Sequence, residues 1–146
     1  MADVQQITDD SFDIVFHPVS NSYAPDIMPV WRECYRALRR GGVLLAGFMN
    51  PIVYIFDDAA QDRGELIVRF ALPYADIHDL PADELEQTIQ RNHTVEFSHT
   101  LETQIGGQLQ AGFVLTHLFE DKDRSPSEGG RSDYFSTCMA TRALKP

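Results

Sequence analysis

Two apolar runs with a helical pattern between them, within residues 11–48, constrain the fold more than any other part of the sequence. The first run, SFDIVF, is rich in β-branched and aromatic residues, which is typical of a strand buried on both faces. It ends at His17-Pro18, because proline has no N–H to donate to a neighbouring strand. The second run, VLLAGF at residues 43–48, has the same character and closes at Asn50-Pro51.

The segment between the two runs is predicted to be a helix. Asp26 is suited to cap its start and Gly41-Gly42 to end it, with arginines near the negative end of the helix dipole. Its apolar face repeats at three- and four-residue steps through Ile27, Val30, Trp31, Cys34, Tyr35 and Leu38. A strand, a helix and a strand with tight links form a βαβ unit, which makes the two strands parallel neighbours.

The part of the chain after Pro51 is less regular at first. Residues 52–56 suit a short helix or a strand, and residues 66–72 suit a β segment. Leu80-Pro81 begins a helix, because proline and acidic residues favour the first turn.

A second periodic segment then precedes two strands. Apolar residues at four-residue spacing indicate a helix over residues 97–109. Gly106-Gly107 lies inside it at a cost of about 1 kcal/mol per glycine relative to alanine, which indicates close packing against a neighbour or a kink. Residues 113–119 and 134–143 are predicted strands, with a polar loop between them.

Composition excludes several classes of partner. The formal net charge is −10, which opposes binding to nucleic acids and to anionic membranes. No apolar run approaches the ~18 residues of a membrane span, and the first residues, MADVQQ, have no signal-peptide character. Cys34 and Cys138 fit no metal or redox spacing and are expected to be free thiols, which favours a cytoplasmic protein.

Four stretches of the sequence resemble class I S-adenosylmethionine-dependent methyltransferases. SFDIVFHPVSN and PVWRECYRALRRGGVLLAGF resemble the fourth strand, which commonly begins with an FD pair, and the following helix and fifth strand. EFSHTLETQIGGQLQAGFVLTHLFED is similar to the next helix and sixth strand, and a small-molecule branch of the family carries a very similar stretch. YFSTCMATRALK is similar to the antiparallel last strand.

The resemblance implies an α/β fold and a methyltransferase that acts on a small molecule. The expected architecture is a partial Rossmann-like sheet, with two parallel strands, a C-terminal antiparallel hairpin and flanking helices. Residues 1–146 correspond to the C-terminal portion of the domain, and residues 52–99 are expected to cover the substrate. The family's glycine-rich cofactor loop and its ribose-binding acid precede the fourth strand, so that half is expected to be absent and the chain inactive alone.

The resemblance also places the cofactor, S-adenosylmethionine. Asp3 and Val4 are similar to the end of the loop that meets the adenine amino group. The backbone of His17, Pro18 and Val19 is expected to meet the methionine portion. In open α/β sheets the ligand lies beyond the carboxyl ends of the parallel strands, which agrees with this position. A simple turn at residues 17–19 is the alternative.

Candidate substrate-binding residues lie at the same end of the sheet. They are Asn21, Tyr23, Asn50 and His99. Asn50 also suits a plain turn before Pro51, and His99 also suits a helix start or a general base. No catalytic residue is expected, because transfer from a sulfonium mainly needs binding, alignment and exclusion of water. None of the five histidines has the spacing of a metal site, so no metal is expected.

Other hypotheses remain open at this point. The chain is either an enzyme portion, or a non-catalytic binding or interaction module, or the partner of a separately encoded N-terminal half. In the family the fourth strand lies between the first and the fifth. Without the first strand, residues 12–16 form an exposed apolar edge, which predicts self-association or marginal stability.

Overall fold

The computed structural model describes residues 7–122 and 130–146 and forms a four-stranded mixed sheet in the order β1-β2-β4-β3. Strands β1 and β2 are parallel, and the other pairs are antiparallel, which confirms the predicted α/β sheet with its C-terminal hairpin. The elements are β1 Phe12–His17, η1 Asn21–Tyr23, α1 Met28–Ala37, β2 Leu38–Met49, η2 Pro51–Ile55, α2 Asp58–Gln61, α3 Asp76–Asp79, α4 Ala82–Gln90, η3 Glu102–Gly106, α5 Gly107–Gln110, β3 Val114–Asp121, η4 Arg131–Asp133 and β4 Cys138–Leu144.

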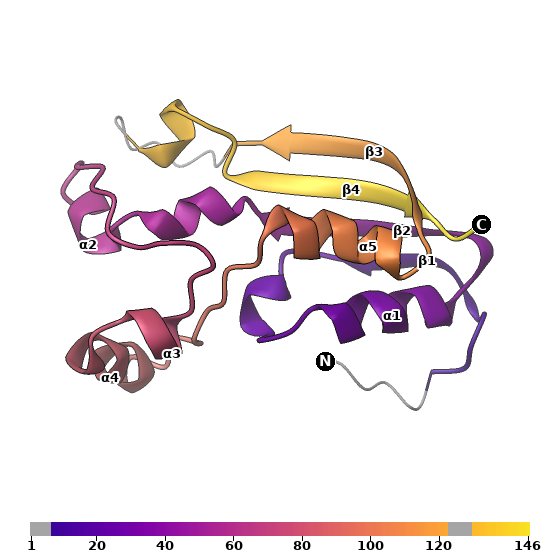
Figure 1. Ribbon diagram of the computed structural model, residues 1–146, viewed down its shortest axis with the longest axis horizontal. Coiled ribbons are helices and arrows are strands. Elements are labelled where there is room, and N and C mark those ends of the chain that lie inside the picture. The colour runs from indigo at the N-terminus through magenta and orange to yellow at the C-terminus, as the bar shows by residue number, and fades with distance from the viewer. Residues whose placement is uncertain (1–6, 123–129) are drawn as a thin grey trace.

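The helices fall into two groups. Helices α1 and α5 pack against the sheet, whereas α2, α3 and α4 lie beyond the end at which β2 finishes (Figure 1). The core between α1, α5 and the sheet includes the fully buried side chains of Ile27, Trp31, Leu38 and Leu44. This packing places the sheet's carboxyl ends next to the segment that follows Met49.

The N-cap of α1 is Ile27, one residue after the predicted Asp26, and the predicted end of the helix is wrong. Asp26 accepts a hydrogen bond from the N–H of Met28 through Oδ1 at 2.9 Å. The helix ends at Ala37 instead of Gly41-Gly42, because Leu38 is extended, fully buried and already paired with β1. Gly41 has a φ of +80°, which suits it to a bend within β2 that other residues rarely adopt.

Lys145 satisfies the carboxyl end of α1. Its ammonium donates to the carbonyl oxygens of Tyr35 and Leu38 at 2.9 and 2.7 Å, and to Asp10 at 2.7 Å. Arginines were predicted at this position, but only Arg36 lies in the last turn. The end of the chain thus ties the last strand to the first crossover helix.

Three predictions for the middle of the chain meet different outcomes. Residues 66–72 form no strand, because their contribution is a single bridge between Val68 and Phe56. The helix predicted after Leu80-Pro81 is present as α4. Of residues 52–56, the first four belong to the 3-10 helix η2, and Phe56 forms that bridge.

The helix predicted over residues 97–109 is shorter and partly widened. It begins after Thr100, forms the π-helical segment η3 and then continues as α5. The close packing predicted for the glycine pair is confirmed at Gly107, where a Cβ atom would lie 2.8 Å from Trp31 Cδ1. Gly106 has no such neighbour, since a Cβ there would meet only Glu102 Cγ at 3.8 Å.

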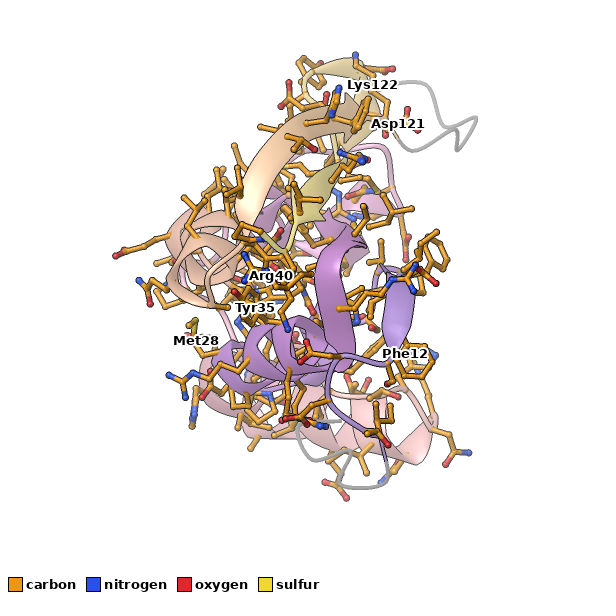
Figure 2. The ribbon with its side chains drawn as sticks, turned by 90° about the vertical axis from the view of Figure 1, so that its right-hand side faces the viewer. Phe12, Met28, Tyr35, Arg40, Asp121 and Lys122 are labelled. Carbon is orange, nitrogen blue, oxygen red and sulfur yellow. The ribbon has the colours of Figure 1, made fainter. Side chains whose placement is uncertain are left out.

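The prediction that strand β1 is buried on both faces is wrong. Phe12, Ile14 and Phe16 are 43%, 59% and 72% exposed, because α1 and α5 cover only the other face and β1 is an edge strand. Figure 2 shows Phe12 at the opposite margin of the molecule from Met28 of α1. The alternate residue Val15 packs against the core instead.

Cys34 is buried and Cys138 is partly buried, and both are free thiols as predicted. None of the helices in residues 7–122 and 130–146 has the length and apolar character required to cross a membrane. The cytoplasmic location stays a prediction.

Candidate functional site

Three of the candidate residues meet where β1 ends. His17 Nε2 lies 2.6 Å from Asn21 Oδ1. His99 Nε2 lies 3.1 Å from the carbonyl oxygen of Asn21 and 2.9 Å from that of Ala24. All three polar side chains are buried, so they hold the loop after β1 against the segment that precedes η3.

The hydrogen bonds continue into the sheet. Asn21 Nδ2 donates to Gln104 Oε1 at 2.7 Å, and Gln108 Nε2 donates to the carbonyl of Gln104 at 2.9 Å. Thr141 then donates to Gln108 Oε1 at 2.9 Å. A fully satisfied buried network of this kind specifies one arrangement, because each unpaired member would be costly. It therefore fixes the loop after β1 relative to η3, α5 and β4.

This network assigns protons to the two histidines. Because the Asn21 amide nitrogen faces Gln104, its oxygen faces His17, and Nε2 of His17 is the donor. Nε2 of His99 faces two carbonyl oxygens and also donates. The geometry favours a structural role for His99 over that of a general base acting through Nε2.

Of the other candidate binding residues, some are exposed to solvent and one uses its side chain in hydrogen bonds within the protein. Pro18, Val19 and Tyr23 are exposed beside the buried network. Asn50 accepts from the N–H of Ile52 and donates to the carbonyl of Ser136 at 2.8 Å, so its amide shapes the turn after β2. Asp3 and Val4 lie outside the described residues.

A cavity of about 960 Å³ opens at this end of the sheet. Val19 and Tyr23 line it from the loop after β1, and Met49 lines it from the end of β2. The remaining walls come from η2, α2, the first residue of α3, α4, the neighbouring segments and Arg131. The cavity therefore lies between the sheet's carboxyl ends and the segment expected to cover a substrate.

Aromatic rings form one part of the cavity wall. The rings of Tyr54 and Tyr74 are stacked, with centroids 5.9 Å apart and an angle of 23° between their planes. Phe70 tilts against Tyr74 at 4.8 Å. Each tyrosine hydroxyl donates to a carboxylate, Tyr54 to Glu96 at 2.9 Å and Tyr74 to Asp76 at 2.6 Å.

Burial controls the ionisation of these groups. Burial raises the pKa of Glu96, and the nearby carboxylates of Asp76 and Asp58 raise it further. Burial and the accepting carboxylates also raise the pKa values of Tyr54 and Tyr74 above the ordinary phenol value. The phenols therefore remain protonated hydrogen-bond donors at neutral pH and are unsuited to act as bases.

Replacing Glu96 by glutamine is expected to stabilise the fold at neutral pH. Because the pKa of Glu96 is raised in the folded state, ionisation destabilises that state above the raised pKa, and protonation removes the cost as the pH falls. Glutamine retains an oxygen that accepts from Tyr54. We expect E96Q to melt at a higher temperature than the unsubstituted chain at pH 7, with the difference disappearing near pH 4.

Thermal melts of both proteins across this pH range measure the effect. E86Q is the matched control, since Glu86 lies on the exposed part of α4 and the substitution removes the same charge. An E96Q advantage that stays constant between pH 7 and pH 4, or one that E86Q reproduces, contradicts the burial argument.

The cavity residues that carry this chemistry were not identified from the sequence. Tyr54 and Glu96 are 42 positions apart and Tyr74 and Asp76 are two apart, and all four lie in short helices or irregular segments without a periodic pattern. The available signal was the concentration of aromatic and acidic residues between positions 54 and 76. In the described part of the chain, no three His, Cys, Asp or Glu side chains come together in a way that would hold a metal ion.

Comparisons with known proteins agree with this arrangement. Residues 1–46 match a family model described as a methyltransferase domain. The chain is 43% identical over 147 residues to YbaJ, an uncharacterized methyltransferase of Bacillus subtilis strain 168, and the match covers 99% of this chain and 55% of that protein. The chain thus spans about half the length of this curated relative.

Solved structures share the fold at low sequence identity. An S-adenosylmethionine-dependent methyltransferase from Mesorhizobium loti matches with a TM-score of 0.67 and 17% identity, over 94% of this chain and 64% of that chain. Another from Methanosarcina mazei matches with a TM-score of 0.63 and 14% identity, over 99% and 63%. The chain is therefore similar in sequence to a methyltransferase domain over residues 1–46 and, over nearly its whole length, to YbaJ, and it shares the fold of part of these solved structures.

Proposed function

We propose that residues 1–146 form the acceptor-binding part of a methyltransferase that acts on a small molecule. The observation that carries this proposal is the cavity of about 960 Å³ at the carboxyl ends of β1 and β2. Open α/β sheets bind ligands at this end, and small-molecule sites have volumes of roughly 300–1,000 Å³. The match of residues 1–46 to a methyltransferase-domain model and the similarity to YbaJ support the same reaction class.

The loop after β1 fits one wall of a cofactor site. S-adenosylmethionine supplies a methyl group that is activated by a positively charged sulfur. Val19 packs on Gly47 of β2, where a Cβ atom would lie 3.4 Å from Val19 Cγ2, so the loop lies close to the strand end. The buried bond between His17 and Asn21 holds this wall, while Pro18 and Val19 stay accessible.

The residues in this chain supply only part of that cofactor site. The strand-to-helix link of the parallel unit, residues 18–27, contains no glycine, whereas phosphate- and nucleoside-binding links of such sheets depend on glycine for close backbone approach. We propose that a glycine-rich loop from outside residues 1–146 completes the site. The role of this chain is to position the acceptor and to exclude water with the aromatic wall.

Binding of S-adenosylmethionine tests this proposal by calorimetry. We expect weak or no binding to residues 1–146 alone. We expect binding in the micromolar range after they are joined to the part of YbaJ that the chain does not match, with that YbaJ part alone as the control. Micromolar binding by residues 1–146 alone contradicts the proposal. Failure of the joined protein to bind favours the alternative, a non-catalytic binding module.

We also propose that the isolated chain associates with a second copy of itself through β1. The exposed side chains of Phe12, Ile14 and Phe16 lie on one face of this edge strand. The opposite edge strand, β3, ends in Glu120 and Asp121, and charges of this kind discourage strand pairing. The two edges of the sheet therefore differ in their tendency to associate.

A further inference from the structure

We infer that the cavity binds a protonated amine, whose ammonium group Glu96 receives beside the rings of Tyr54 and Tyr74. The inference rests on the proposed function, because it names the chemical class of the methyl acceptor. It is carried by three features of the cavity, namely its aromatic wall, its unbalanced carboxylates and the way in which Glu96 is held.

The aromatic wall suits a cation. The stacked rings of Tyr54 and Tyr74 line the cavity, and Phe70 packs against Tyr74 while its own ring is already covered by the guanidinium of Arg69, 4.8 Å from the ring centroid. The negative potential of ring faces attracts ammonium groups, and the attraction increases where water is excluded. A neutral or anionic ligand gains nothing from this potential.

Six carboxylates and four arginines line the cavity, and three of those carboxylates, Asp62, Asp76 and Glu96, form no ion pair with a described residue. Arg69 pairs with Asp57 and Glu84, and Arg131 pairs with Asp58 at 3.3 Å. The hydrogen-bond donors to Asp76 and Glu96 are neutral, namely the tyrosine hydroxyls and a backbone N–H, and the only arginine whose charge lowers the pKa of Glu96 among its main influences is Arg131, which pairs with Asp58. The cavity therefore has an excess of negative charge beside the aromatic rings.

Glu96 is positioned by reciprocal hydrogen bonds with Asp76. The N–H of Asp76 donates to the carbonyl of Glu96 at 3.0 Å, and the N–H of Glu96 donates to Asp76 Oδ2 at 2.8 Å. Both oxygens of Asp76 are thus engaged, because Oδ1 accepts from Tyr74. Glu96 Oε2 accepts a hydrogen bond from the hydroxyl of Tyr54. Among the described residues Oε1 has no hydrogen-bond donor, so it is available to a ligand.

This arrangement also provides for the proton of the amine. An ammonium nitrogen has no lone pair and accepts no methyl group until it loses a proton. Transfer of that proton to Glu96 breaks one N–H bond, leaves its electron pair on nitrogen and converts the carboxylate to a carboxylic acid. The raised pKa of Glu96 favours the acceptance of a proton, and the bond from Tyr54 remains in place.

Calorimetric titration of residues 1–146 with three ligands of matched size tests the inference. Phenethylamine carries a positive charge at pH 7, 2-phenylethanol is neutral and phenylacetate is negative. We expect phenethylamine to bind at least about tenfold more tightly than 2-phenylethanol, because hydrogen bonds to charged groups are roughly twice as strong as neutral ones. We expect no measurable binding of phenylacetate.

Substitution of the receiving carboxylate supplies the second measurement. E96Q is expected to weaken phenethylamine binding at least about tenfold and to leave 2-phenylethanol binding unchanged, while E86Q leaves both unchanged. Thermal melts confirm that each variant is folded. Equal affinities for the amine and the alcohol, no binding of the amine, or full amine binding by E96Q would overturn the inference.

These measurements are independent of the cofactor. If the joined protein fails to bind S-adenosylmethionine while residues 1–146 still select the amine, the proposed function fails and the amine site stands. If the joined protein binds S-adenosylmethionine but the amine shows no preference, the proposed function stands and the amine inference fails.

Discussion

Gly107→Ala is expected to destabilise the fold by about 2 kcal/mol. An added Cβ would lie 2.8 Å from both Met28 Sδ and Trp31 Cδ1, which is closer than real Cβ contacts. The Met28 side chain can move, but the Trp31 ring is fully buried and donates through Nε1 to the carbonyl of Thr103 at 3.0 Å. Overpacking of this kind costs about 1–3 kcal/mol, and it outweighs the smaller helix-propensity gain of alanine.

Urea unfolding and thermal melts measure the effect. A loss of about 2 kcal/mol corresponds to a fall of roughly 6 °C in melting temperature for a domain of this size. Gly106→Ala is the matched control, because its Cβ would meet only Glu102 Cγ at an ordinary 3.8 Å. It is expected to stabilise the fold by about 0.5–1 kcal/mol. Destabilisation of similar size by both substitutions contradicts the packing argument.

The glycine pair shows how far local sequence reasoning reaches. Two glycines in a helical pattern signal a close approach, but the sequence cannot tell which glycine faces the neighbour, because η3 changes the helical phase before Gly107. The parallel unit was predictable because its strands and helix have local hydrophobic patterns. The end of its helix was not predictable, because no local pattern determines it. Hydrophobic periodicity is local, whereas the extended conformation of Leu38 depends on pairing with Phe12, 26 positions earlier in the chain.

In the candidate site, too, the features with a local sequence pattern were predictable and those that depend on distant residues were not. The loop after β1 was predictable, since a strand that stops at Pro18 places the following residues at the sheet's end. The buried network beyond Asn21 was not, because it joins Gln104 and Thr141 to the loop through side-chain contacts over long sequence separations. The reciprocal bonds between Asp76 and Glu96 likewise leave no periodic signal.

The isolated chain is expected to elute from gel filtration at no less than twice its mass of 16.5 kDa. Parallel sheets are normally covered on both faces, and β1 instead exposes alternate apolar side chains and an unpaired backbone edge. A second copy offers the same strand, so two β1 edges can pair around a twofold axis. We expect the double variant Ile14→Lys with Phe16→Lys to elute as a monomer, because charged side chains block edge pairing.

The opposite edge of the sheet provides the matched control. Val114 and Leu118 of β3 are each 50% exposed, and their replacement by lysine adds the same two charges. We expect this control to keep the larger mass of the unsubstituted chain. Lysines at exposed positions cost little folding energy, so circular dichroism should show all three proteins folded. A monomeric, thermally stable unsubstituted chain contradicts association altogether. If the β3 variant is monomeric and the β1 variant still associates, the interface lies at β3. Either outcome would mean that the exposed side chains of β1 do not mediate association.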